Sequence, residues 1–157
     1  MKTCCVTGHR DIPLHQQQTI WSRLEQEVER AIADGYICFL SGFAEGIDLL
    51  FAKIVADKCR MYPYIRLEAV LPYRGQYTRL MKTADTRALL DSCTAVQVVS
   101  ETSHSGVYHQ RNRYMVERSS RVIAVYDGRK TGGTVYTVQY ARRQEKDVRM
   151  VRMGSRT

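Results

Sequence analysis

Short apolar runs alternate with longer amphipathic stretches along this chain. Each apolar run has the length and the β-branched content of a buried strand, and the runs lie at residues 3–7, 36–41, 65–71, 95–99, 121–126 and from Val148 onward. The stretches between them carry apolar residues at helical spacing, as Ile20, Leu24 and Val28 do. These predicted helices lie at residues 16–34, 46–60, 76–92, 108–119 and from the Gly132-Gly133 loop to about 146.

The regular order of strand and helix predicts a single α/β domain over residues 1–157. Strands joined by helices pair in parallel through right-handed crossovers, which gives a Rossmann-like three-layer fold: a mainly parallel sheet flanked by helices. Pro72 is expected to end the third strand, because proline cannot donate to a sheet ladder. In such folds ligands bind beyond the carboxyl ends of the strands, where the strand order reverses.

Composition narrows the class of protein. The chain has 44% apolar and 25% charged residues, which excludes a disordered chain, and we expect no membrane span because no apolar run approaches the roughly 18 residues needed. The N-terminus lacks the pattern of a secretory signal, so we expect a cytoplasmic protein. The net charge of +8 favours phosphate-bearing partners without choosing between a nucleotide and a nucleic acid.

Cysteine and histidine residues give no sign of a metal site. The five cysteines are odd in number and lack CxxC spacing, which is typical of reduced, buried thiols. The four histidines are scattered and show no HExxH-type pair. We therefore expect neither a metal nor a resident cofactor.

Three strand-to-helix junctions carry the small and polar residues that suit an anion site. Glycine lets a ligand approach the backbone, and free N–H groups at a helix start hold phosphate, although each junction could equally be a plain turn. Neither glycine pair matches GxGxxG or the P-loop. The candidate residues are Thr7, Gly8, His9 and Arg10, then Ser41, Gly42, Gly46 and Asp48, and then Gly132, Gly133, Thr134 and Thr137.

Other polar and aromatic residues follow the predicted strands. Arg10 could bind phosphate with its guanidinium fork, or it could be a surface arginine. Tyr73 and Gln76 follow the third strand, where a tyrosine could stack on a base or simply pack. Asn112 could hydrogen-bond a ligand or the local backbone.

These motifs resemble the SLOG superfamily, and within it the YoqJ/YpsA-like branch. The resemblance rests on the segments Val6–Arg10, Ser41–Asp48, Leu71–Gln76, Arg111–Val116, Ile123–Gly128 and Gly132–Ala141, in order over nearly the whole chain. It implies a Rossmann-like fold whose glycine motifs, around Gly42/Gly46 and Gly132/Gly133, bind nucleotides or nucleotide-derived ligands. Its relatives include the Lonely guy phosphoribohydrolases and the single-stranded DNA binder DNA-processing protein A.

One departure from the Lonely guy motif PGGxGTxxE points away from catalysis: Thr137 stands where those enzymes have a glutamate, and Thr131 replaces the proline. The leading hypothesis is therefore a protein that binds or senses a nucleotide-type ligand, and an apolar helix face would also allow a homo-oligomer. A nucleotide-processing N-glycoside hydrolase is the first alternative, with acid-base candidates Asp48, Glu45, Glu117 and Asp127. A weak nucleic-acid binder is the second, through the basic residues Arg142, Arg143, Lys146, Arg149 and Arg152.

Overall fold

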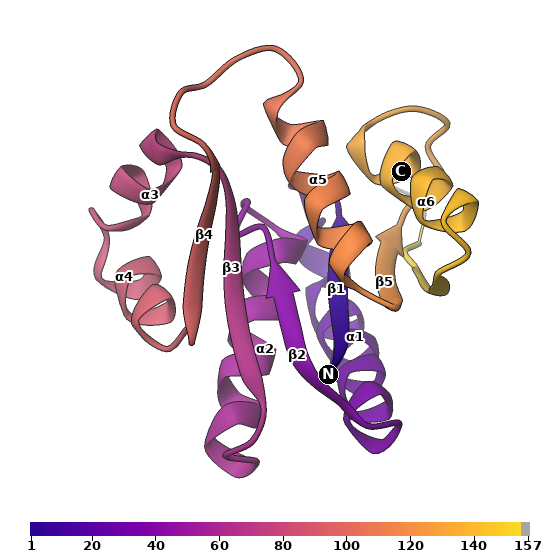
Figure 1. Ribbon diagram of the computed structural model, residues 1–157. Coiled ribbons are helices and arrows are strands. Elements are labelled where there is room, and N and C mark those ends of the chain that lie inside the picture. The colour runs from indigo at the N-terminus through magenta and orange to yellow at the C-terminus, as the bar shows by residue number, and fades with distance from the viewer. Residues whose placement is uncertain (155–157) are drawn as a thin grey trace.

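The computed structural model describes residues 1–154, and within them the chain forms one six-stranded sheet (Figure 1). All five neighbouring pairs are parallel, and the strand order is β4-β3-β2-β1-β5-β6. The strands are β1 (Lys2–Gly8), β2 (Tyr36–Ser41), β3 (Arg66–Tyr73), β4 (Ala95–Ser100), β5 (Arg121–Tyr126) and β6 (Asp147–Arg152). The predicted α/β class and parallel sheet are confirmed.

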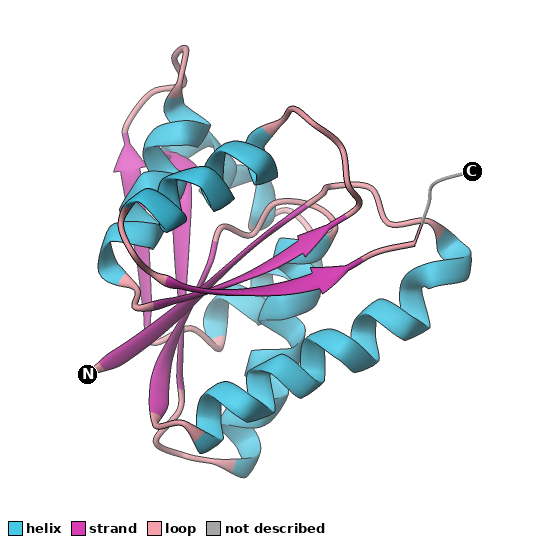
Figure 2. Ribbon diagram, turned by 90° about the vertical axis from the view of Figure 1, so that its right-hand side faces the viewer, coloured by secondary structure: helices cyan, strands magenta, loops and turns pink. Residues whose placement is uncertain are grey.

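Helices cover both faces of this sheet, which Figure 2 shows twisted between them. The helices are η1 (Leu14–Gln16), α1 (Gln17–Ala33), α2 (Ile47–Met61), α3 (Arg74–Leu80), α4 (Ala84–Asp91), α5 (Val107–Arg118) and α6 (Gly133–Arg143). The larger hydrophobic cluster joins one face to α1, α2, α3 and α4. The smaller cluster joins the other face to α5 and α6 through Met115, Val116 and Ala141. Within residues 1–154 no helix is both long and apolar enough to cross a membrane.

Two boundary predictions were wrong. The stretch 76–92 is not one helix, because Thr83 adopts extended backbone and starts α4, while the Thr86 hydroxyl bonds to the Leu80 carbonyl oxygen. Such local hydroxyl bonds compete with helix continuation. Pro72 does not end β3 either: the pairing of β3 with β2 stops at Ala69, so proline lies where that side of the strand has no ladder to interrupt.

The strand order reverses between β1 and β5. The chain adds β2, β3 and β4 on one side of β1 and then returns to place β5 and β6 on the other. At a reversal the two crossover connections diverge, which leaves a crevice outside the carboxyl ends of the adjacent strands. A ligand site is therefore expected at the carboxyl ends of β1 and β5.

Candidate functional site

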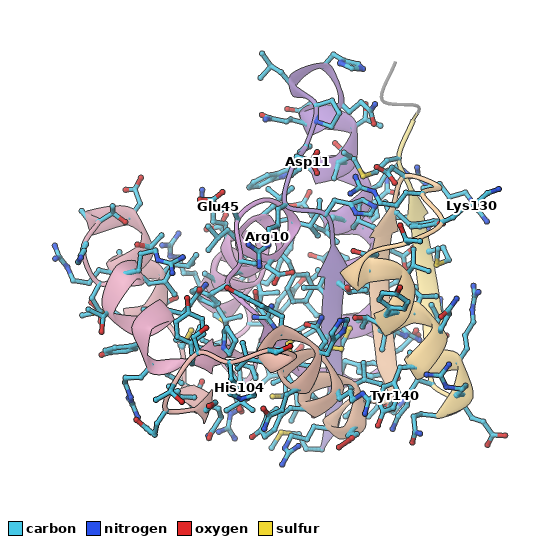
Figure 3. All side chains as sticks on the ribbon, turned by 90° about the horizontal axis from the view of Figure 1, so that it is seen from above. Arg10, Asp11, Glu45, His104, Lys130 and Tyr140 are labelled. Atoms are coloured by element: carbon cyan, nitrogen blue, oxygen red, sulfur yellow. The ribbon has the colours of Figure 1, made fainter. Side chains whose placement is uncertain are left out.

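A cavity of about 490 Å³ opens at this reversal. Its wall is built from the end of β1, the first turns of α2 and α5, and the loop before α6. Figure 3 views the molecule from above, with Arg10 near the centre of that view. Of the residues predicted from the sequence, the cavity brings together Thr7, Gly8, His9, Arg10, Asp48, Asn112, Gly132, Gly133 and Thr134.

The first glycine motif serves close packing. A Cβ on Gly42 would lie 2.4 Å from Arg111 Nη1 and 2.7 Å from Asp48 Oδ2. A Cβ on Gly46, whose φ is +83°, would lie 2.4 Å from the Arg10 carbonyl oxygen. The Ile47 N–H at the start of α2 donates to the His9 carbonyl oxygen at 3.2 Å. Neither Gly42 nor Gly46 lines the cavity, so this motif holds the wall together.

The second glycine motif faces the cavity directly. A Cβ on Gly133 would meet no atom within 4 Å, and Gly132, the N-cap of α6, has a φ of +121°. No side chain caps this helix, and the first N–H groups of a helix have no partner within it. Gly132, Gly133 and Thr134 therefore offer the positive end of α6 to the cavity.

Thr137 does not reach the cavity. Its hydroxyl donates to the Gly133 carbonyl oxygen at 2.8 Å within α6, and its side chain is buried. It lines a neighbouring hollow between α5 and α6 instead. The hydroxyl at the position of the Lonely guy glutamate is thus turned back onto its own helix.

A buried carboxylate ties the β1 and β5 loops together. The Asp127 backbone N–H donates to His9 Nε2 at 3.1 Å, and the Asp127 carboxylate lies 3.1 Å from the same nitrogen. Arg129 Nη2 donates to Asp127 Oδ2 at 2.6 Å and approaches Asp11 at 3.6 Å. The hydrogen bonds from Arg129 hold the pKa of the Asp127 carboxyl well below its usual range. Such a carboxylate is a weak base and is poorly suited to take a proton. Its contacts with His9 and Arg129 anchor the loop that carries Gly132.

Asp48 has the opposite environment. Burial raises the pKa of its carboxyl above the ordinary value, against the attraction of the Arg111 guanidinium and the Ala44 N–H, which donates at 3.4 Å. Arg111 is 4% exposed and donates to the Gly42 carbonyl oxygen at 2.8 Å. Sequence reasoning missed this buried arginine, which lines the cavity, because nothing in the α5 sequence separates it from its exposed neighbour Arg113.

Arg10 stacks on a second missed residue, Tyr108. The Arg10 Cζ lies 4.9 Å from the Tyr108 ring centroid, on the cavity wall. Burial would raise the pKa of Tyr108, but hydrogen bonds from Tyr73 and Arg10 lower it below its ordinary value. Tyr73 packs edge-on to Tyr108 at 6.3 Å between ring centroids, and it does not line the cavity.

The remaining predicted residues support the wall from behind or lie elsewhere. Ser41 Oγ donates to the Asp48 carbonyl oxygen at 2.8 Å, and Gln76 Nε2 donates to the Phe43 carbonyl oxygen at 3.3 Å. Both bonds brace a turn in which Phe43 has a φ of +56°. Glu45 lines a different hollow, beside α1, and Glu117 accepts a hydrogen bond from Tyr140.

Histidine, cysteine and acidic side chains are dispersed in the described part of the chain. No group of three or more histidine, cysteine, aspartate or glutamate side chains there is arranged to hold a metal ion. Cys4, Cys5 and Cys38 are buried free thiols, while Cys59 and Cys93 are half-buried. At the basic C-terminal end, Arg149 is paired with Asp147 at 2.8 Å, which offsets part of the charge.

Comparison with known proteins agrees with the fold and the motifs. Residues 4–154 match the family model described as the YspA SLOG family. The chain belongs to this family. A UPF0398 protein of Halalkalibacterium halodurans is 24% identical over 96% of this chain and 88% of its own length. A UPF0398 protein of Shouchella clausii is 27% identical over 80% of this chain and 68% of its own length.

Two solved structures share the fold. DNA processing protein A from Helicobacter pylori, described for its single-stranded DNA binding mode, superposes with a TM-score of 0.66 at 14% identity. The match covers 95% of this chain but 64% of that protein, so this chain spans less than two thirds of it. The structural-genomics target TM1055 superposes with a TM-score of 0.57 at 15% identity, over 94% of this chain and 72% of that one.

Proposed function

We propose that this protein binds a nucleotide or a nucleotide-derived, phosphate-bearing ligand in the cavity between β1 and β5. The observation that carries the proposal is that the uncapped start of α6 and the Arg10 guanidinium border the same cavity. Backbone N–H groups, a helix dipole and a guanidinium fork are the groups that bind phosphate in proteins. The volume of about 490 Å³ lies in the range of small-molecule sites.

The rest of the wall suits the sugar and the base of such a ligand. Asn112 offers an amide, and Asp48 a carboxylate that accepts hydrogen bonds from hydroxyl or amino groups. Asp48 is 7% exposed, so a hydrogen bond formed there is shielded from water. Adenine nucleotides and their ADP-ribose-like derivatives are the ligand class we expect.

Binding or sensing is favoured over catalysis. Release of a base needs a carboxylate placed to assist the water and the sugar cation. Thr137 is bonded to Gly133, and Asp127 is held by Arg129, which leaves Asp48 as the carboxylate on the cavity wall with a raised pKa. Asp48 is therefore the residue on which the alternative, an N-glycoside hydrolase, depends.

Ligand-induced stabilisation tests the proposal. We expect one or more adenine-containing nucleotides to raise the melting temperature, because a ligand that binds only the native state stabilises it. Arg10→Ala should weaken binding by roughly 1.5 to 3 kcal/mol, the range for charge-assisted hydrogen bonds, with little change in stability. Arg60→Ala is the matched control, since Arg60 is exposed in the last turn of α2. No shift with any nucleotide at millimolar concentration, or equal binding by the Arg10 variant, would refute it.

A further inference from the structure

A groove along α5 adjoins the cavity, and His109, Asn112 and Tyr136 border both. It consists of a hollow of about 410 Å³ between α5 and α6 and a hollow of about 630 Å³ between α5 and Val99 of β4, and both border His109 and Arg113. We call it the α5–α6 groove and define it by Arg113, Tyr114, Arg118, Tyr136, Tyr140 and Arg143. In the described residues, α5 and α6 are the helices that pack on this face of the sheet (Figure 1).

Aromatic rings and guanidinium groups are paired along this groove. The Arg118 Cζ lies 3.4 Å from the Tyr114 ring centroid, and the Arg113 Cζ lies 5.2 Å from that of Tyr140. Tyr136, which is 48% exposed, packs edge-on to His109 at 5.6 Å between ring centroids. Tyr136 offers an exposed ring to planar groups, Tyr114 and Tyr140 are half-buried beside their arginines, and the guanidinium groups offer positive charge to anions.

The charge of the groove selects the kind of partner. Three arginines border it against one carboxylate, that of Glu117, which already accepts the Tyr140 hydroxyl at 2.7 Å. A second copy of this chain would bring the same positive face against itself, and like charges in an interface oppose association. The groove therefore fits a polyanion.

We propose that the α5–α6 groove binds single-stranded nucleic acid, with Tyr136, Tyr140 and Tyr114 stacking on bases and Arg113, Arg118 and Arg143 contacting phosphates. An acidic peptide would satisfy the charges but leave the rings unused. A duplex keeps its bases stacked on each other, whereas an unpaired strand exposes base faces to tyrosine. This surface shares Arg143 with the basic C-terminal set predicted from the sequence and Tyr136 with the cavity. Arg113 and Tyr140 belong to neither, so variants at these two residues test the groove alone.

Binding of a fluorescein-labelled oligothymidine of about 15 nucleotides, followed by anisotropy at low salt, tests this surface. We expect Arg113→Ala and Tyr140→Leu each to weaken binding about fivefold or more, since stacking and phosphate contacts have effects of this size. Tyr140→Phe should bind like the parent, because it keeps the ring and loses only the hydroxyl bonded to Glu117. Arg149→Ala, in the C-terminal end, is the matched basic control and should change little. Circular dichroism and melting curves confirm that each variant is folded.

Each other outcome overturns the proposal. Absence of binding, or equal binding by the parent and the Arg113 and Tyr140→Leu variants, removes the groove from nucleic-acid contact. A loss confined to Arg149→Ala moves the contact to the C-terminal end. Duplex or polyglutamate competing as well as the single strand would identify a general polyanion surface. Full displacement by a mononucleotide, with binding of the strand weakened by Arg10→Ala and unchanged by Tyr140→Leu, would place the strand in the cavity instead.

Discussion

Gly42→Ala should destabilise this protein although it adds a single methyl group. The new Cβ would lie 2.4 Å from Arg111 Nη1 and 2.7 Å from Arg111 Cζ, so the guanidinium must move. Overpacking of this kind costs about 1 to 3 kcal/mol. Loss of the 2.8 Å bond from Arg111 to the Gly42 carbonyl oxygen adds a further cost of about 1.5 to 3 kcal/mol, the range for a hydrogen bond to a charged group.

The combined loss of about 2.5 to 6 kcal/mol should lower the melting temperature by about 5 to 24 °C, since 1 kcal/mol shifts a domain of this size by about 2 to 4 °C. Gly133→Ala is the matched control. Its Cβ would meet nothing within 4 Å, so we expect an unchanged or slightly raised melting temperature. Differential scanning calorimetry measures both. A Gly42→Ala midpoint within about 2 °C of the parent would refute the packing role given to this glycine.

Three further outcomes follow from the cavity wall. Gly133→Asp should abolish the nucleotide-induced rise in melting temperature, because it puts a carboxylate at the start of α6; unchanged binding would exclude this loop. In urea unfolding, Asp48→Asn should be more stable than the parent at pH 7 and Asp127→Asn less stable, because their pKa values are raised and lowered respectively. The Asp48 difference should shrink as the pH falls toward the ordinary aspartate pKa of about 3.9, and the Asp127 difference as the pH falls below it. A difference that persists at the lowest pH would assign the effect to packing. The protein should not release base from nucleoside monophosphates, as followed by chromatography; turnover of about one per second that Asp48→Asn abolishes would establish an enzyme.

The order of strands and helices could be predicted because each apolar run has one environment, the sheet core. The break at Thr83 could not, because the apolar residues of α3 and α4 keep helical spacing while threonine hydroxyls bond locally. The prediction that Pro72 ends β3 was wrong for a related reason. A strand tolerates proline where the neighbouring strand has already ended, and the residues around Pro72 in the sequence do not determine where β2 ends.

The sequence predicts an anion site at both glycine motifs, but the two have different surroundings in the fold. Gly42 is excluded from carrying a side chain by Arg111, which lies 69 positions away in sequence, whereas Gly133 has open space. Arg111 itself was missed because burial of an arginine depends on carbonyl groups that come from β3 and the loop after β2. Sequence reasoning thus located the candidate loops, while the separation of wall from ligand-facing surface required tertiary contacts.

The unequal covering of the two sheet faces has a dynamic consequence. Met115, Val116 and Ala141 are the buried apolar residues that α5 and α6 contribute to the smaller cluster, whereas α2 alone places Phe51, Ile54 and Val55 in the larger one. Opening the α5–α6 layer therefore exposes less apolar surface than opening the α1–α2 layer, and its amide protons should exchange with solvent at a lower free-energy cost. The cavity and the groove both border this less stable α5–α6 layer. A ligand bound at either place should therefore slow the exchange of amide protons along α5 and α6.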